Sequence, residues 1–146
     1  MTTSLASARA VTDGVLAALD AAGLLVGDAT APAAGGWQGA AGQSQFTPYV
    51  VVHPLPGGRL AGTIAHPNET AKLVFQVTAW GSTREQAEWA ADGARSALLA
   101  SGAVTEAGRS VFSVTVELLA GCWLDDTVRP ALHRTGDRFA VTTVPA

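Results

Sequence analysis

Hydrophobic positions along the chain follow a helical period in two segments. From 4 to 22 the apolar residues recur at helical spacing, and Gly23 follows as a stop signal. The apolar face of this first helix consists of Leu5, Ala8, Val15, Leu16 and Leu19. The capping box Ser82-Thr83-Arg84-Glu85 predicts the start of a second helix, which runs to about Ala100 and is ended by Gly102. Its inward stripe consists of Ala87, Ala91, Ala94 and Leu98.

Four other segments have the pattern of strands. The short β-branched run 49–53 is closed by a predicted turn at 54–58, where two prolines and two glycines stand together. In 72–80 and in 138–143, apolar and polar residues alternate with a period of two. A fourth strand is predicted to bury Phe112, Val114, Val116 and Leu118. The order helix, strand, strand, helix, strand, strand predicts an α+β fold: a mainly antiparallel sheet of about four strands with two helices packed on one face.

The segments 24–45 and 59–70 show no convincing period. The first contains a Gly/Ala-rich stretch at 33–42, and the second contains Gly62 and Pro67. We interpret both as loops that are mobile in the free protein and become ordered on assembly. The whole chain, 1–146, is predicted to form a single domain.

Composition narrows the classes of function. Lys+Arg 9 against Asp+Glu 12 gives a net charge of -3 with no basic run, so we expect no specific nucleic-acid recognition. A single cysteine, Cys122, forms no intramolecular disulfide and suits a reducing compartment. The N-terminus lacks the features of a signal peptide and no apolar run is long enough to span a bilayer, so we expect no membrane association.

No motif in the sequence indicates catalysis. The glycine-rich segment 35–42 lacks the Gly-Lys-Ser/Thr that holds phosphate, and the three histidines have no metal-ligand spacing. We therefore predict no enzymatic activity, no metal site and no cofactor. An alternative from another class is a small ligand-binding domain or an unrecognised enzyme, with a site built from Asp125, Asp126, His133 and loop residues.

Tryptophans stand on predicted faces that do not meet the core. Trp89 lies nearly opposite the alanine stripe of its helix, and Trp80 lies on the strand face opposite Phe75 and Val77. Large aromatic side chains in such places are typical of subunit interfaces. The alternative is that a loop, such as the Gly/Ala-rich one, covers each ring. The candidate subunit or partner contacts are Trp37, Trp80, Arg84, Glu88 and Trp89.

Several stretches resemble the tail terminator proteins of long-tailed, siphovirus-type actinobacteriophages. These stretches are 48–58 (PYVVVHPLPGG), 75–78, 82–89, 137–139 and 142–145. They extend over most of the chain from Pro48 onward, and the helix before them fits the same layout. The sequence departs from that layout at Ala90 and Gly93, where larger residues are usual.

The resemblance implies a structural protein of the virion tail, assembled in the host cytoplasm. Such a protein joins the growing tail tube as a homo-hexameric ring, ends tube polymerisation and presents a surface for head joining. Its partners are further copies of itself, the tail tube protein and the head-side connector protein. A head-to-tail connector or other neck protein is the alternative within the same particle, because it has a similar size and ring symmetry.

Overall fold

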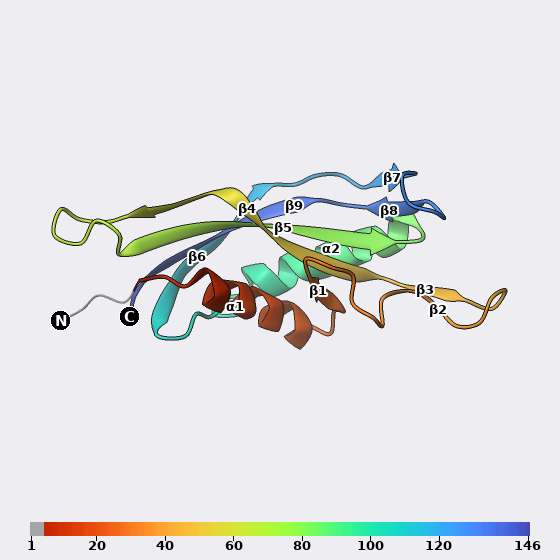
Figure 1. Ribbon diagram of the computed structural model, residues 1–146, viewed down its shortest axis with the longest axis horizontal. Coiled ribbons are helices and arrows are strands. Elements are labelled where there is room, and N and C mark those ends of the chain that lie inside the picture. Colours follow the sequence, from red (N-terminus) through yellow and green to blue (C-terminus); the bar gives the residue numbers. More distant parts are fainter. Residues whose placement is uncertain (1–4) are drawn as a thin grey trace.

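The computed structural model describes residues 5–146, and its fold is α+β with one large sheet covered on one face by two helices (Figure 1). The elements are α1 (Ala8–Ala21), β1 (Val26–Asp28), β2 (Gly36–Gln38), β3 (Gln45–Thr47), β4 (Tyr49–Ala61), β5 (Thr70–Gly81), α2 (Arg84–Leu99), β6 (Arg109–Leu118), β7 (Trp123–Asp125), β8 (Leu132–Arg134) and β9 (Asp137–Pro145). The α+β class is confirmed. The expected sheet of about four antiparallel strands was inexact, because the sheet has seven strands and β1 pairs with β4 in parallel. In the part of the chain described, no helix is long and apolar enough to cross a membrane.

Strand β5 is the centre of the sheet. It pairs with β4 along one edge, and with β9 and then β8 along the other. Strand β6 pairs with β9, and β7 pairs with β8. Strands β2 and β3 form a separate two-stranded hairpin that lies at the same end of the molecule as β7 and β8 (Figure 1).

The main core lies between the helices and one face of the sheet. The alternation predicted for β5 is confirmed, since Phe75, Val77 and Ala79 are buried there. The alanine stripe of α2 packs over them, and α1 adds Val11 and Leu19. The structure explains why α2 has small residues at positions 90 and 93. Ala90 is fully buried, and a Cβ on Gly93 would lie 3.3 Å from a methyl carbon of Leu24. Small side chains therefore let the segment after α1 approach α2 closely.

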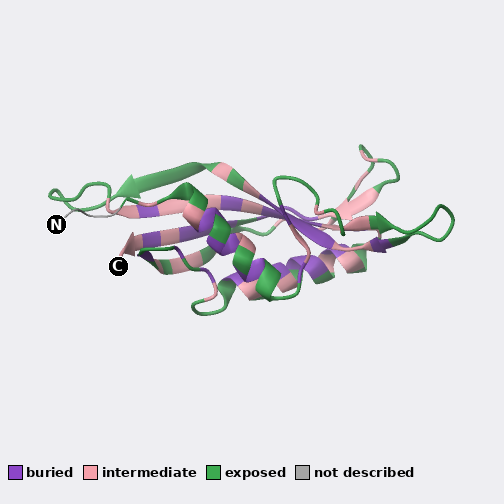
Figure 2. Ribbon diagram, turned by 60° about the horizontal axis from the view of Figure 1, so that its bottom comes forward, coloured by how far each residue is buried: buried purple, intermediate pink, exposed green. Residues whose placement is uncertain are grey.

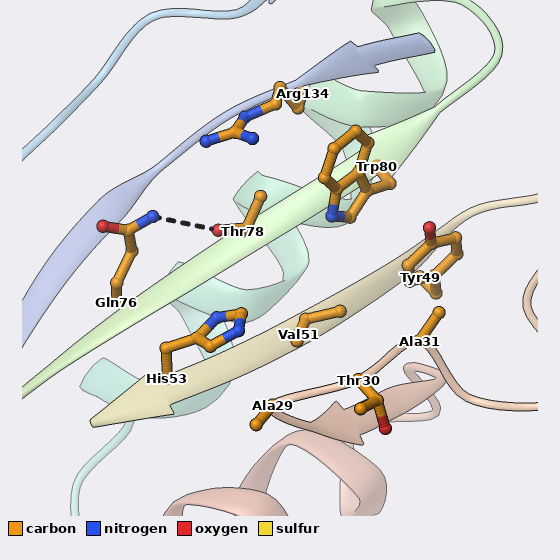
Figure 3. A pocket seen from close by; sticks show the side chains of 10 residues that line it. All are labelled: Ala29, Thr30, Ala31, Tyr49, Val51, His53, Gln76, Thr78, Trp80 and Arg134. Atoms are coloured by element: carbon orange, nitrogen blue, oxygen red, sulfur yellow. Dashed lines mark hydrogen bonds between the residues drawn. The ribbon is translucent and has the colours of Figure 1, made fainter. Parts of the chain in front are cut away.

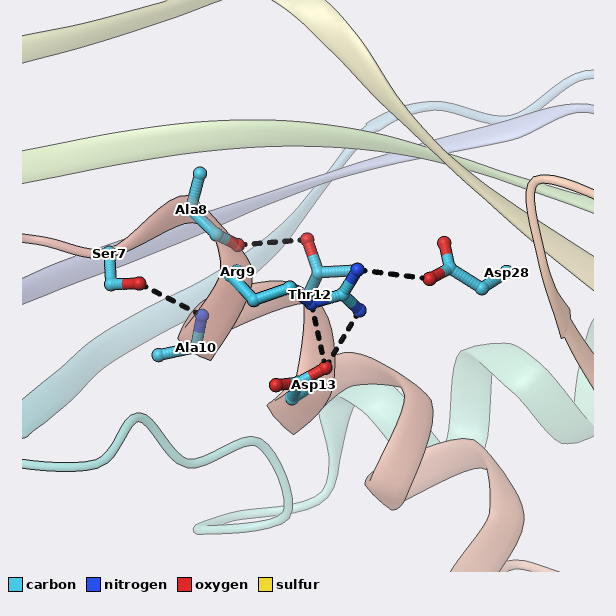
Figure 4. A network of polar contacts seen from close by, with 7 residues as sticks. All are labelled: Ser7, Ala8, Arg9, Ala10, Thr12, Asp13 and Asp28. Atoms are coloured by element: carbon cyan, nitrogen blue, oxygen red, sulfur yellow. Dashed lines mark hydrogen bonds and ion pairs between the residues drawn. The ribbon is translucent and has the colours of Figure 1, made fainter.

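Helix α1 begins later than predicted. The Ser7 side chain accepts a hydrogen bond of 3.1 Å from the Ala10 N–H, so Ser7 is the N-cap and Ala8 is the first helical residue (Figure 4). Arg9 forms ion pairs with Asp13 and Asp28, which tie the first turn to β1. Ser4, the predicted start, lies outside the described residues.

Helix α2 begins one residue later than the predicted capping box. Thr83, not Ser82, is the N-cap, and its side chain accepts a hydrogen bond from the Gln86 N–H. The Gln86 side chain reaches back to accept from the Ser82 N–H at 2.9 Å. Thr83 therefore caps the helix, and Gln86 holds Ser82, the residue before the cap, by accepting from both its N–H and its hydroxyl. The helix ends at Leu99, close to the prediction.

The interpretation of 24–45 as one long loop was wrong. The segment contributes β1 to the large sheet and β2 to the small hairpin. Glycines make these close contacts feasible, because a Cβ on Gly35 would lie 2.9 Å from the Tyr49 side chain. Small residues therefore let the backbone of this segment lie close to its neighbours, and short strands form here without bulky side chains. The mobility of the segment stays a prediction.

The predicted turn at 54–58 was also wrong. Strand β4 continues through Pro54 and Pro56 to Ala61, with a register shift between Leu55 and Arg59. Prolines are tolerated here because this half of β4 is an edge, where no neighbouring strand needs their missing N–H groups. The expected loop 59–70 shrinks to the hairpin connection 62–69.

Strand β6 differs from its predicted alternation. Val111 pairs with Thr143 and Ser113 pairs with Thr142, so Phe112 is an extra residue in a bulge and is 74% exposed. A second shift after Val116 leaves Leu118 46% exposed. The alternation of β9 is confirmed, with Phe139, Val141 and Thr143 all buried.

A buried ion pair lies at the turn end of the β4–β5 hairpin, beside the start of β5. Arg109 and Glu106 lie 3.3 Å apart with side chains that are each 1% exposed. Arg109 also donates to the Glu69 carbonyl at 2.6 Å, and Glu106 accepts from the Ser7 N–H at 3.0 Å. Breaking such a buried pair leaves an uncompensated charge, so this cluster holds the N-cap of α1, the start of β6 and the end of the connection 62–69 together.

Candidate functional site

An ordered row of ring and guanidinium groups crosses the helix-free face of the sheet. The register places Tyr49 opposite Trp80, Trp80 opposite Arg134, and Arg134 opposite Trp123. Cross-strand partners share a face, so four neighbouring strands each present one of these side chains in line. Trp80 stands on this face because alternation puts Phe75, Val77 and Ala79 on the other one.

The groups of this row are in contact. The Tyr49 and Trp80 rings are stacked with centroids 6.4 Å apart, and the Arg134 guanidinium lies 5.1 Å from the Trp80 ring and 4.8 Å from the Trp123 ring. Such cation–π contacts are worth about 0.5–1 kcal/mol each at exposed sites. Phe46 continues the row at 6.0 Å from Tyr49, and Trp37 meets Phe46 edge-on at 5.3 Å. We call these six residues the aromatic row: Trp37, Phe46, Tyr49, Trp80, Arg134 and Trp123.

Hydrogen bonds fix the cation within the aromatic row. Arg134 donates to an Asp125 carboxylate oxygen at 3.3 Å. Hydrogen bonds from Thr127, and then the charge of Arg134, hold the pKa of Asp125 below its ordinary value, so this carboxylate is charged at neutral pH. Burial raises the pKa of the Tyr49 phenol, which keeps that ring protonated and neutral. The aromatic row is therefore apolar except for one paired positive charge.

A hollow of about 250 Å³ opens beside the aromatic row (Figure 3). Val51 and Thr78 are its buried floor, and Trp80 and the segment 29–31 stand at its sides. Its lining is completed by Tyr49, His53, Gln76 and Arg134. Small-molecule sites usually measure about 300–1,000 Å³, so this hollow is sized for a single large side chain.

Trp89 lies on the outer surface of α2 and is 60% exposed. The prediction that the core face of the helix does not bury Trp89 is confirmed, and a covering loop is not found among residues 5–146. Arg84 and Glu88 form an exposed ion pair on the same helix. Hydrogen bonding to Glu88 raises the pKa of Arg84. Exposed pairs of this kind are screened by solvent, so this one matters more for surface charge than for stability.

The five predicted contact residues therefore form two groups. Trp37 and Trp80 both belong to the aromatic row, whereas Arg84, Glu88 and Trp89 stand on α2, on the helix side of the sheet. Sequence reasoning missed Phe46, Tyr49, Trp123 and Arg134. The sequence signal for this site was the position of Trp80 on the strand face away from the core. Its neighbours could not be found from that signal, because they depend on the register of strands that are far apart in the sequence.

The alternative cluster near the C-terminus does not come together. Asp125 is engaged by Thr127 and Arg134, and His133 precedes Arg134 in β8 and so points to the other face of the sheet. Across residues 5–146 no three His, Cys, Asp or Glu side chains are grouped to hold a metal ion. Cys122 is half-buried, and burial raises the pKa of its thiol, which keeps it protonated.

Comparison with known proteins adds no relative. No known protein family matches the chain, and no curated protein matches its sequence. The resemblance to tail terminators therefore stays a prediction, and the role of the protein is inferred from its own residues and geometry.

Proposed function

We propose that this protein is a structural tail protein that caps the tail tube of a long-tailed phage as a ring. The ring ends tube polymerisation and presents a surface for head joining. The observation that carries the proposal is the exposure of large aromatic side chains on opposite sides of the molecule: Trp89 on α2, and Trp37 and Trp123 on the sheet side, with exposures of 60, 46 and 41%. A ring of identical copies needs two different, complementary surfaces on each copy.

The exposed outer part of β4 and the connection that follows it give further support. Residues 56–68, the outer part of β4 and most of its connection to β5, form an exposed arm that extends past the helices (Figure 2), whereas the adjacent half of β5 pairs with β9. Leu60 is 53% exposed and Ile64 fully so, although the buried Arg109–Glu106 cluster holds the end of the connection at Glu69. Grouped exposed apolar residues on a firmly held arm are typical of assembly surfaces. The arm is suited to contact the tube or a neighbouring subunit.

The test is a tube polymerisation assay with purified tail tube protein. Tubes grown with this protein are expected to be shorter, with a ring at one end in electron micrographs. An equal amount of an unrelated 15-kDa-class protein serves as the control for crowding. Unchanged tube lengths and bare tube ends would contradict the proposal. Binding only to the head portal would instead assign the chain to the head-to-tail connector.

A further inference from the structure

We propose that Trp89 of one copy inserts into the hollow beside the aromatic row of the next copy. This inference rests on the proposed ring and names the contact that builds it. It also joins the two separate groups of aromatic residues into one interface. The occupant of the hollow is therefore a second copy of this chain.

The inserting group is a large side chain in an acidic setting. Trp89 is 60% exposed, and helical spacing puts Glu85 one turn before it and Asp92 one turn after it. Arg95 pairs with Asp92 at 3.0 Å, whereas Glu85 forms no ion pair within residues 5–146. The surface around Trp89 is thus apolar at its centre and, in the described part of the chain, carries one unpaired carboxylate, Glu85, because Arg84 pairs with Glu88 and Arg95 with Asp92.

The hollow has the matching shape and chemistry. Its volume of about 250 Å³ suits one large ring, and Trp80 offers an aromatic wall for the incoming indole. A buried indole N–H needs an acceptor, and the side chains of His53 and Gln76 line the hollow. Figure 3 shows that the Gln76 amide nitrogen is turned to Thr78, at 3.2 Å, which leaves its oxygen turned away from that bond.

Charge favours the acidic helix as the occupant. Arg134 lines the hollow but is already paired with Asp125, whereas Arg138 lies directly across from Gln76 on the same face. Arg138 is exposed and forms no ion pair among the residues described, as is true of Glu85. Opposite charges around a central aromatic anchor are the usual arrangement of a specific interface.

The positions of the two groups exclude a contact within one chain. Trp89 is on the outside of the helix layer, and the hollow is on the helix-free face of the sheet. Each copy therefore gives a tryptophan to one neighbour and receives a tryptophan from another. Contacts of this head-to-tail kind generate rings when the rotation between copies closes.

Two single variants separate the halves of the contact. Trp89→Ala removes the inserting ring and leaves the hollow intact. Ala31→Trp fills the hollow from an exposed position in its lining and leaves Trp89 intact. The matched controls are Leu99→Ala, on an exposed position of the same helix, and Ala34→Trp, on an exposed position outside the hollow.

Sedimentation velocity is run on all five proteins, in whichever condition the wild type assembles, alone or with tail tube protein. Trp89→Ala and Ala31→Trp are each expected to weaken self-association by more than about tenfold, because the first removes the central hot spot and the second blocks the hollow that receives it. The controls should assemble like the wild type. A 1:1 mixture of the two defective variants should form pairs and no rings, since one supplies an open hollow and the other a free tryptophan.

Three outcomes would overturn the inference. Assembly of Trp89→Ala at wild-type strength would show that another surface joins the copies, and the ring function would stand. A mixture that forms no pairs would contradict the head-to-tail contact. A wild type that neither self-associates nor binds tube ends would contradict the proposed function itself, and the inference with it. Circular dichroism of each variant confirms that it is folded.

Discussion

The two faces of the central sheet differ in chemistry although the same strand supplies both. On the helix-covered face, β5 presents Phe75 and Val77, and both are 2% exposed beneath the helices. On the helix-free face it presents Gln76 and Trp80, which line the hollow. The period of two along a strand thus separates the residues that stabilise the fold from those that are available for contact.

The difference also explains where the tryptophans lie. The covered face is closed by the alanine stripe of α2, which brings the helix close to the sheet and leaves no room there for an indole. Trp89 is consequently outside and Trp80 is on the opposite face. Close packing on one side of the sheet therefore places the large aromatic groups where a second copy can reach them.

The largest expected loss of stability comes from a substitution on the covered face. Phe75→Ala should lower the free energy of unfolding by about 3–5 kcal/mol, because it leaves a cavity at the centre of the core. Urea denaturation measures the loss, and Gln76→Ala, the next residue on the other face, is the control. A loss under about 1 kcal/mol would mean that the two faces do not divide stability in this way.

A smaller loss of stability is expected from a substitution on the helix-free face. Trp80→Ala should cost about 1–2 kcal/mol of monomer stability, because it removes the stacking on Tyr49 and the contact with Arg134 from a half-buried site. It should also weaken self-association, because the hollow loses its aromatic wall. Equal losses for Trp80→Ala and Phe75→Ala in the same urea titration would erase the contrast between the faces.

The smallest effect tests the cation of the aromatic row. Arg134→Lys keeps the charge but loses the planar group that lies between two indole rings, so a loss of about 0.5–1 kcal/mol is expected. Thermal unfolding at constant salt measures it. The control is Arg138→Lys, on an exposed arginine of β9, which should leave the melting temperature unchanged. Identical behaviour of both variants would argue against the stacking.

Sequence patterns predicted the covered face well. The alternation of 72–80 and the alanine stripe of 87–98 identified the centre of the core, because both patterns record burial against a single partner layer. The edges were predicted poorly. β4 runs through two prolines and β6 contains a bulge at Phe112, and neither is visible without the pairing of the neighbouring strand.

The candidate site was half accessible to sequence reasoning. The faces of Trp80 and Trp89 follow from period alone, and the structure confirms both placements. The hollow and the position of Arg134 do not, because they depend on β8 pairing with β5 and on the segment 29–31 lying along β4, and these parts are distant in the chain. Tertiary pairing, and not local propensity, creates this surface.

The most direct test of the central claim is the molar mass of the wild-type protein, measured by light scattering alone and again with tail tube protein. The account predicts a closed ring in at least one condition, and the resemblance to terminators predicts six times the chain mass of 14.8 kDa. Negative-stain images should show the same ring at tube ends. A mass of one chain in both conditions, with bare tube ends, would contradict it.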